Sequence, residues 1–203
     1  MPEDAVIGAE RKLATVLFAD LVGSTALASA EDPERVRFRL ERFYEGMADE
    51  IQGAGGTVEK FAGDAVMAVF GAPAALEDHA ERALHAALAM QRRLDELFHG
   101  ELALRLGVNT GEVVVGRARE GSSFVSGDAV NVAARLEQSA CAGEILVGER
   151  TVSAVRGAFE LAAIGLLHSV EHDDGQVVRG GDRRGGLLRA GGPGGVDGGD
   201  GLG

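Results

Sequence analysis

The stretch "TVEKFAGDAVMAVFG" (residues 57–71) decides the fold, because it predicts two short strands joined by a tight turn. Gly63 and Asp64 stand between two runs rich in apolar residues, which is the pattern of a β-hairpin. A hairpin in this part of the chain is a starting point from which the neighbouring elements can be placed.

A helix is predicted on each side of the hairpin. The first begins at the Asp-Pro pair of residues 32–33 and ends at the glycines of residues 53–56. Its apolar residues recur every three or four positions and form one face, made of Val36, Leu40, Phe43, Met47 and Ile51. The second helix runs from about Glu77 to Phe98, and we expect its histidines, His79 and His85, to be solvated.

A further apolar segment lies outside each helix. "LATVLFA" (13–19) predicts a central strand, and "LALRLGVNTGEVVVG" (102–116) predicts one strand or two strands interrupted at residues 109–111. The order β-α-β-β-α-β predicts an α/β domain with a ferredoxin-like core, in which two helices pack on one face of the sheet. A third helix is predicted over residues 128–140, and "EILVG" (144–148) adds another strand.

The composition is typical of one soluble domain. The 203 residues are 45% hydrophobic and have a formal net charge of -12, which argues against non-specific nucleic-acid binding because that requires clustered Lys and Arg. No stretch approaches the roughly 18 apolar residues needed to span a membrane, and the first residues lack a signal-peptide pattern. We therefore expect a cytoplasmic protein that neither binds nucleic acid nor inserts into a membrane.

The two ends of the chain differ from its middle. Residues 175–203 are rich in glycine and lack apolar periodicity, so they cannot bury enough surface to offset the entropy of ordering them. We expect residues 1–10 to be flexible, residues 11–165 to form the domain, and residues 166–203 to be a disordered tail. The glycine and arginine content of the tail suggests a frameshift or a truncation.

Two aspartates are predicted to meet at one edge of this sheet. Asp20 follows the first strand and Asp64 lies at the hairpin tip, and in a ferredoxin-like sheet the first strand usually lies beside the strand that leaves the hairpin. Paired carboxylates with room for water and phosphate are typical ligands of Mg²⁺. The alternatives are that Asp20 is a helix N-cap and that Asp64 is an ordinary turn residue.

The turn after Asp20 is expected to bind phosphate. It is small, contains glycine and leads toward a helix, and backbone N–H groups at such a turn can hold the outer phosphates of a triphosphate. The candidate residues are Leu21, Val22, Gly23, Ser24 and Thr25.

A second motif lies in the third helix. In "GDAVNVAARLE" (127–137), Asn131 and Arg135 stand four residues apart and so share one face of the helix. An amide suits a ribose or phosphate oxygen, and a guanidinium suits a phosphoryl group during transfer. The alternative is a surface arginine with a neighbouring asparagine.

Together these segments resemble the catalytic domain of the class III adenylate/guanylate cyclases, most closely the bacterial single-domain type. The resemblance covers residues 11 to about 165 and rests on "VLFADLVGST", "EKFAGDAVMAVFGAP", "LALRLGVNTGEVVVG" and "GDAVNVAARLEQSACAGEILVGERT". It implies an adenylate cyclase that converts ATP to 3',5'-cyclic AMP and pyrophosphate in cyclic nucleotide signalling. It also implies a homodimer with its sites between two subunits, and it leaves room for a regulatory domain or partner outside this chain.

The resemblance implies a role for each candidate residue. Asp20 and Asp64 would bind two Mg²⁺ or Mn²⁺ ions, one at the 3'-hydroxyl of ATP and one at the triphosphate. Asn131 would orient the ribose, and Arg135 would stabilise the charge that develops at the α-phosphate. Lys60 matches the lysine that recognises adenine.

Two features depart from the family pattern. Phe124, seven residues before Asn131, stands where many members have an Asp or Thr that pairs with adenine, and Phe cannot hydrogen-bond to the exocyclic amine. This leaves GTP open as a substrate. Moreover, no lysine follows Lys60, whereas family members continue into two strands with a lysine that contacts the triphosphate in the transition state. Loss of one such donor typically lowers the rate by about 10² to 10³.

These departures and the fold leave two alternatives to an active adenylate cyclase. One is a catalytically weak or inactive cyclase-fold module that dimerises or regulates a partner, and the missing lysine favours it. The other is a diguanylate cyclase, which shares the β-α-β-β-α-β core. Its hairpin would have a "GGDEF"-like sequence, which "AGDAV" (62–66) does not match.

Overall fold

A computed structural model describes residues 10–24, 32–116, 124–155, 158–166 and 176–181 of the chain. Its strands are β1 (Glu10–Val22), β2 (Thr57–Ala62), β3 (Ala65–Phe70), β4 (Ala103–Val115), β5 (Val125–Ser126), β6 (Ile145–Val147), β7 (Glu160–Leu166) and β8 (Gln176–Gly181). Its helices are α2 (Pro33–Gly53), α3 (His79–Phe98), α4 (Asp128–Ser139) and α5 (Glu149–Ala154).

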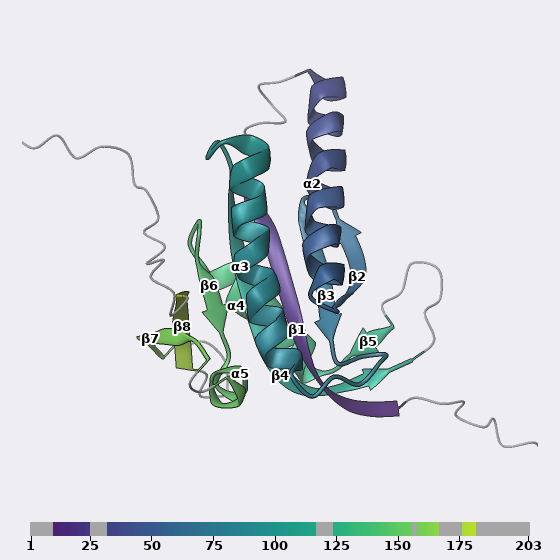
Figure 1. The fold of residues 1–203 in the computed structure, drawn as a ribbon, viewed down its shortest axis with the longest axis vertical. Coiled ribbons are helices and arrows are strands. Elements are labelled where there is room, and N and C mark those ends of the chain that lie inside the picture. The colour runs from purple at the N-terminus through teal and green to yellow at the C-terminus, as the bar shows by residue number, and fades with distance from the viewer. Residues whose placement is uncertain (1–9, 25–31, 117–123, 156–157, 167–175, 182–203) are drawn as a thin grey trace, which may run out of the picture.

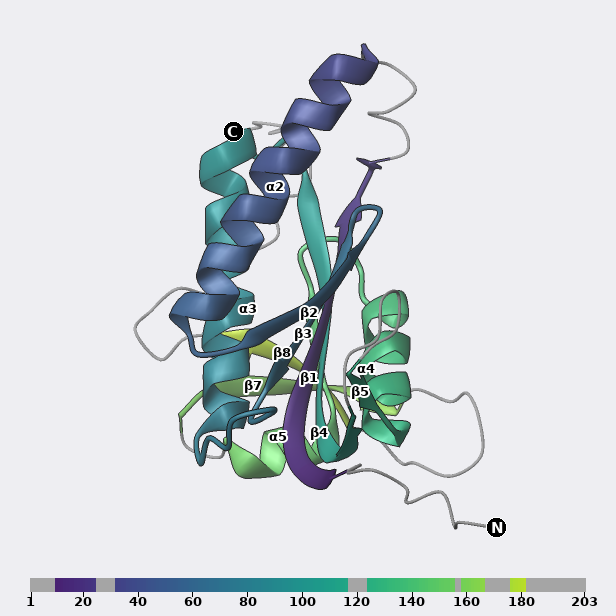
Figure 2. The same cartoon turned by 90° about the vertical axis from the view of Figure 1, so that its right-hand side faces the viewer.

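The main sheet has the strand order β2-β3-β1-β4-β5, and β6 pairs with β4. The central strand, β1, is antiparallel to both β3 and β4, whereas β6 is parallel to β4. Helices α2 and α3 cover one face of the sheet and α4 covers the other (Figures 1 and 2). The predicted ferredoxin-like α/β core is therefore confirmed, including the position of the first strand beside the strand that leaves the hairpin.

The larger hydrophobic core lies between the sheet and helices α2 and α3. Residues Phe43, Met47 and Ile51 of the predicted α2 face are fully buried there. Val36 and Leu40 belong to the same stripe but are only half-buried, because this end of α2 extends past the sheet (Figure 1). The start of the helix is stabilised by Asp32, whose Oδ1 accepts a hydrogen bond from the Glu34 backbone N–H at 3.0 Å.

Helix α4 packs closely on β4 because of a glycine. A side chain at Gly107 would collide with the backbone of Ala133 and Glu137, so a larger residue would push the helix away from the sheet. The apolar face of α4, including Ala129 and Ala133, packs on the second core that β1, β3 and β4 form on this side. Gly107 therefore sets the distance between the sheet and the helix that contains Asn131 and Arg135.

Several predicted boundaries are wrong. The first strand is longer than residues 13–19 and extends from Glu10 to Val22, so Glu10 belongs to the sheet rather than to a flexible end. Strand β4 is continuous, so the predicted interruption at residues 109–111 does not exist: Asn109, Thr110 and Gly111 each pair with a residue of β1. Pairing with a long neighbouring strand holds these residues extended despite the turn-forming residue types.

The predicted disordered tail is also wrong in part. Residue 166 ends β7, and residues 176–181 form β8, which pairs with β7 in antiparallel orientation. Backbone hydrogen bonds to a neighbouring strand stabilise β8, and the short Gln176–Val178 run within a glycine-rich region concealed this in the sequence. The rest of the predicted tail lies outside the described residues, as do residues 1–9. Among the described residues, no helix is long and apolar enough to cross a membrane.

Candidate active site

Asp20 and Asp64 lie together at one end of the sheet, as predicted. Asp20 pairs with Ala65 in the β1–β3 ladder, and the backbone N–H of Leu21 donates to the carbonyl oxygen of Asp64 at 3.3 Å. Asp20 lies within β1, which continues to Val22, so the N-cap alternative for Asp20 is wrong. Antiparallel pairing of β1 with the strand after the hairpin brings the two carboxylates to the same place.

The turn after β1 reaches the same place. Gly23 has a left-handed backbone conformation, with φ at 89°, and the Ser24 hydroxyl donates to Oδ2 of Asp64. Leu21 is buried, whereas Val22 and Ser24 are half-buried and Gly23 is exposed. Thr25 lies outside the described residues. The predicted phosphate-binding turn is therefore adjacent to the aspartates.

A residue that the sequence analysis missed, Arg105, binds Asp20. The two residues are directly opposite each other in the β1–β4 ladder, and Arg105 donates from Nε to Asp20 Oδ2 at 2.8 Å and also from a terminal nitrogen. Arg105 Nε also lies 2.8 Å from Glu137 Oε1 of α4, without the angle of a hydrogen bond. The sequence signal for this contact was a charged residue inside the apolar segment "LALRLGV", because a charge among buried residues requires a partner.

The charges of this cluster shift one another's pKa values. The pKa of Glu137 is raised, first by burial and then by the negative charges of Asp20 and Asp64, although Arg105 opposes this. Burial alone would lower the pKa of Arg105, but the hydrogen bond to Asp20 and the charge of Glu137 raise it overall. Arg105 therefore stays protonated and offsets the clustered carboxylates.

Asn131 and Arg135 lie on the exposed side of α4. Both side chains are exposed, whereas Ala129, Ala133 and Leu136 of the same helix are buried. Within the described part of the chain, no hydrogen bond or ion pair joins Asn131 or Arg135 to Asp20 or Asp64. The fold of one chain therefore brings the two aspartates together but leaves the Asn/Arg pair facing outward.

The two predicted base-reading positions are connected by a residue that sequence reasoning did not select. Lys60 is exposed on β2, and Phe124 is half-buried just before β5. The residue before Lys60, Glu59, accepts a hydrogen bond at Oε1 from the Phe124 backbone N–H at 2.5 Å. Its position next to Lys60 was the only signal in the sequence.

Comparison with known proteins identifies the family. The protein-family model described as the adenylate and guanylate cyclase catalytic domain matches residues 9–177. The chain belongs to the adenylate and guanylate cyclase catalytic domain family. This confirms the resemblance, and the diguanylate cyclase alternative is wrong.

Individual relatives agree with this assignment. The adenylyl cyclase CyaB from P. aeruginosa superimposes with a TM-score of 0.82 at 29% identity, covering 88% of this chain and 98% of that one. The guanylyl cyclase Cya2 gives 0.78 at 31% identity, covering 86% and 93%. Adenylate cyclase 1 of Rhizobium meliloti is 36% identical over 63% of this chain and 21% of its own length. An uncharacterized protein of Mycobacterium tuberculosis is 37% identical over 75% of this chain, but the cyclase domain spans only 29% of that relative.

Asp20 and Asp64 could supply some of the ligands of a metal ion, with phosphate and water supplying the others. Within the described residues, no group of three or more His, Cys, Asp or Glu side chains could hold a metal ion. Asp20 and Asp64 make the hydrogen bonds described above through Oδ2, which leaves Oδ1 of each for a cation. Mg²⁺ is commonly bound by one or two carboxylates together with phosphate and water, so these residues fit Mg²⁺ or Mn²⁺ in the presence of a nucleotide.

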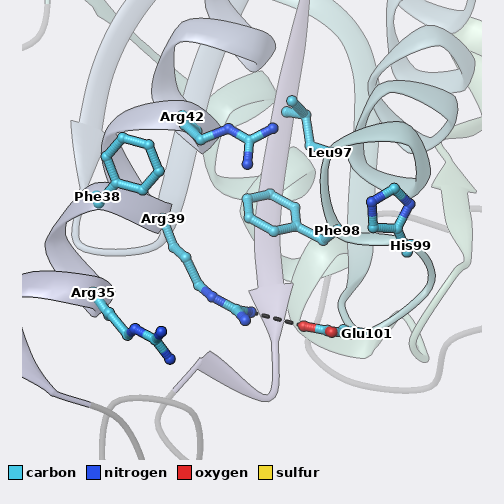
Figure 3. A pocket seen from close by; sticks show the side chains of 8 residues that line it. All are labelled: Arg35, Phe38, Arg39, Arg42, Leu97, Phe98, His99 and Glu101. Atoms are coloured by element: carbon cyan, nitrogen blue, oxygen red, sulfur yellow. Dashed lines mark hydrogen bonds and ion pairs between the residues drawn. The ribbon is translucent and has the colours of Figure 1, made fainter.

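A hollow on the other face of the sheet contains none of these residues. It lies between α2 and the end of α3 and is lined by Arg35, Phe38, Arg39, Arg42, Leu97, Phe98, His99 and Glu101 (Figure 3). Arg39 forms an ion pair with Glu101 at 2.9 Å, and the Arg42 guanidinium stands 6.0 Å from the centre of the Phe38 ring. This hollow is separate from the predicted catalytic residues.

Proposed function

We propose that this cyclase domain converts ATP to 3',5'-cyclic AMP and pyrophosphate, as a homodimer with two equivalent sites. The observation that supports this most is the meeting of Asp20 and Asp64 beside Ser24, in a chain of the cyclase family. The relatives include both adenylate cyclases and a guanylyl cyclase, so the choice of ATP rests on the match of Lys60 to the adenine-recognising lysine of the family. Because the substrate would be ATP, we place the domain in the cytoplasm.

In the proposed reaction, the 3'-oxygen of ATP attacks the α-phosphorus and pyrophosphate leaves. Bound to Asp20 and Asp64, two Mg²⁺ or Mn²⁺ ions would lower the pKa of the 3'-hydroxyl and neutralise charge on the triphosphate. The turn of residues 21–25 would bind the outer phosphates through its backbone N–H groups. Asn131 would hold the ribose, and Arg135 would stabilise the negative charge that grows on the α-phosphate.

The exposed positions of Asn131 and Arg135 support the proposed dimer. Asn131 and Arg135 are exposed on α4, and among the described residues no hydrogen bond or ion pair joins them to Asp20 or Asp64. A two-fold arrangement would let each subunit contribute its aspartates to one site and its Asn/Arg pair to the other. The relatives are several times longer than this domain, so we also propose that a regulatory segment or partner controls the assembly.

Complementation between two inactive variants tests the shared site. Asp20→Ala and Arg135→Ala should each be inactive alone. Mixing them should restore about one intact site per heterodimer, measured as cyclic AMP formed from Mn-ATP. Separate affinity tags on the two chains verify that heterodimers form. A verified heterodimer that is as inactive as its parents would show that the two residues do not share an intersubunit site.

A second candidate function is a weak or inactive cyclase-fold module that dimerises or regulates a partner. It is favoured by the absence of any lysine after Lys60. A chimera distinguishes the two candidates: replacing the residues after Gly165 with the lysine-bearing ending usual in the family should raise the rate by about 10² or more if the missing donor limits catalysis. If neither the native chain nor a folded chimera forms cyclic nucleotide, the non-catalytic function is favoured.

A further inference from the structure

Glu59 contacts the predicted base-binding region from an irregular point in β2. In the β2–β3 ladder, Val58 pairs with Ala68 and Lys60 pairs with Met67, so Glu59 is an extra residue in a β-bulge. Its Oε1 accepts a hydrogen bond from the Phe124 backbone N–H at 2.5 Å. The bulge thus joins β2 to the segment before β5, although these strands stand at opposite ends of the sheet order.

The second oxygen of this carboxylate has no partner in the part of the chain that the structure describes. Glu59 Oε2 is buried and has no hydrogen bond among the described residues. A carboxylate oxygen can accept more than one hydrogen bond, and a buried acceptor that is left unpaired costs about 1–3 kcal/mol. An unpaired buried acceptor next to a predicted ligand position indicates that the ligand supplies the missing donor.

The backbone at residue 124 is held on both sides. Its N–H donates to Glu59, and its carbonyl oxygen accepts from the Gly116 backbone N–H at 2.7 Å. The Phe124 ring is half-buried against the core on the α4 side of the sheet and has no group that could hydrogen-bond to a purine. Among the described residues, the only carboxylate bonded to this position therefore comes from β2, one residue before Lys60.

We propose that Glu59 is a specificity-determining residue, whose Oε2 accepts a hydrogen bond from the 6-amino group of adenine. This inference rests on the proposed function and extends it. Phe124 uses one carboxylate oxygen, which leaves one acceptor for a base. In adenine the 6-amino group lies beside the ring nitrogen N1, which is an acceptor, and Lys60 could donate a hydrogen bond to N1. Guanine has a carbonyl oxygen in place of this amino group, which the carboxylate would repel. Because Oε2 is buried in the free chain, binding of the amino group would displace the atoms that cover it.

The variant Glu59→Gln separates base recognition from support of the backbone. Its amide oxygen can still accept the Phe124 N–H, while its NH₂ group replaces the free acceptor with a donor. We expect the kcat/KM ratio of ATP over GTP to fall by about 10² or more. The matched control is Glu112→Gln, because the Glu112 side chain is 71% exposed on β4 and faces Arg11. It should leave the ratio unchanged.

A substrate analogue tests the same contact from the ligand side. Purine riboside triphosphate lacks the 6-amino group. With the wild-type chain its kcat/KM should be about 10-fold or more below that of ATP, and with Glu59→Gln the two substrates should be used about equally. If Glu59→Gln does not fold, judged by thermal unfolding, Glu59→Asp replaces it. The shorter carboxylate should also reduce the preference for ATP over the analogue.

The outcomes separate this inference from the proposed function. A wild-type chain that makes no cyclic nucleotide contradicts the proposed function, and Glu59 is then judged by competition of ATP, GTP and the analogue against a fluorescent nucleotide. If the Glu59 variant distinguishes ATP from GTP and from the analogue less well than the wild-type chain does, either assay supports the inference. A folded Glu59 variant with wild-type discrimination, or a wild-type chain that prefers GTP, overturns it.

Discussion

Two polar clusters span the same pair of strands, five residues apart along β1, and they differ in chemistry. Thr15 and Thr110 face each other in the β1–β4 ladder, as do Asp20 and Arg105. The first pair belongs to a buried chain of hydrogen bonds that runs from His79 Nδ1 to Thr15 at 2.7 Å, to Thr110 at 2.7 Å and to Thr151 at 2.8 Å. The second pair belongs to the charged cluster of Asp20, Arg105 and Glu137.

The difference shows how one ladder can contain both a structural and a chemical site. The hydroxyl cluster links α3, β1, β4 and α5, and hydroxyl groups both donate and accept, so its members satisfy one another. In the charged cluster one guanidinium faces two carboxylates, while Asp64 lies beside them with Ser24. Only the charged cluster has carboxylate oxygens that remain free to bind a cation. We therefore expect changes in the hydroxyl cluster to affect stability alone, and changes to the aspartates beside Arg105 to affect activity.

The largest expected effect comes from removing either aspartate. Asp20→Ala and Asp64→Ala should each lower the rate of cyclic AMP formation from Mn-ATP by about 10³ or more, because metal ions stabilise the transition state by several kcal/mol. The circular dichroism spectrum should remain that of the folded chain. The matched change in the hydroxyl cluster, Thr110→Val, should keep the native rate but lower stability, since it leaves the Thr15 and Thr151 hydroxyls with one partner fewer. Native activity in either aspartate variant would contradict the metal assignment.

A smaller effect is expected when the charged cluster loses its cation. Arg105→Gln leaves the Glu137 side chain, which is 10% exposed, without a positive partner and should lower the free energy of unfolding by about 1–3 kcal/mol. Urea unfolding of Arg105→Gln, Glu137→Gln and the double variant measures the coupling. The double variant should be less destabilised than the sum of the single variants. Additive losses would show that the two charges do not interact.

The smallest effect concerns the pH dependence of stability. Burial lowers the pKa of His79 below its ordinary value of 6.5, although Asp78 opposes this. As the pH falls below about 6.5 the unfolded chain takes up this proton more readily than the native chain, so stability falls until the pH passes the folded pKa of His79. His79→Asn should remove this part of the acid-induced loss in urea unfolding between pH 7 and pH 5.

The exposed histidine of the same helix is the control. The His85 ring is tilted against that of Phe159, with the ring centres 4.9 Å apart, and His85 is exposed to solvent, so His85→Asn removes a histidine from the same helix without removing a buried one. If both variants flatten the profile equally, burial of His79 is not the cause. The expectation that both histidines are solvated is correct for His85 and wrong for His79, which is 8% exposed.

The sequence by itself determined the hairpin, its flanking helices and the meeting of Asp20 with Asp64. These depend on local periodicity, on turn residues and on a strand order that few alternatives satisfy, all of which can be read along the chain. The roles of Asn131, Arg135 and Lys60 remain predictions.

Only the tertiary structure decided which side chains face each other across strands. Arg105 opposite Asp20, Glu59 against Phe124, and His79 beside Thr15 each join residues more than 60 positions apart. Such pairs depend on the register between strands, on a bulge in β2 and on the docking of α3, and a shift of one residue would turn each strand side chain to the other face of the sheet. Strand β8 was not predicted for the same reason, because it is stabilised by hydrogen bonds to β7 and its own sequence has no strand pattern.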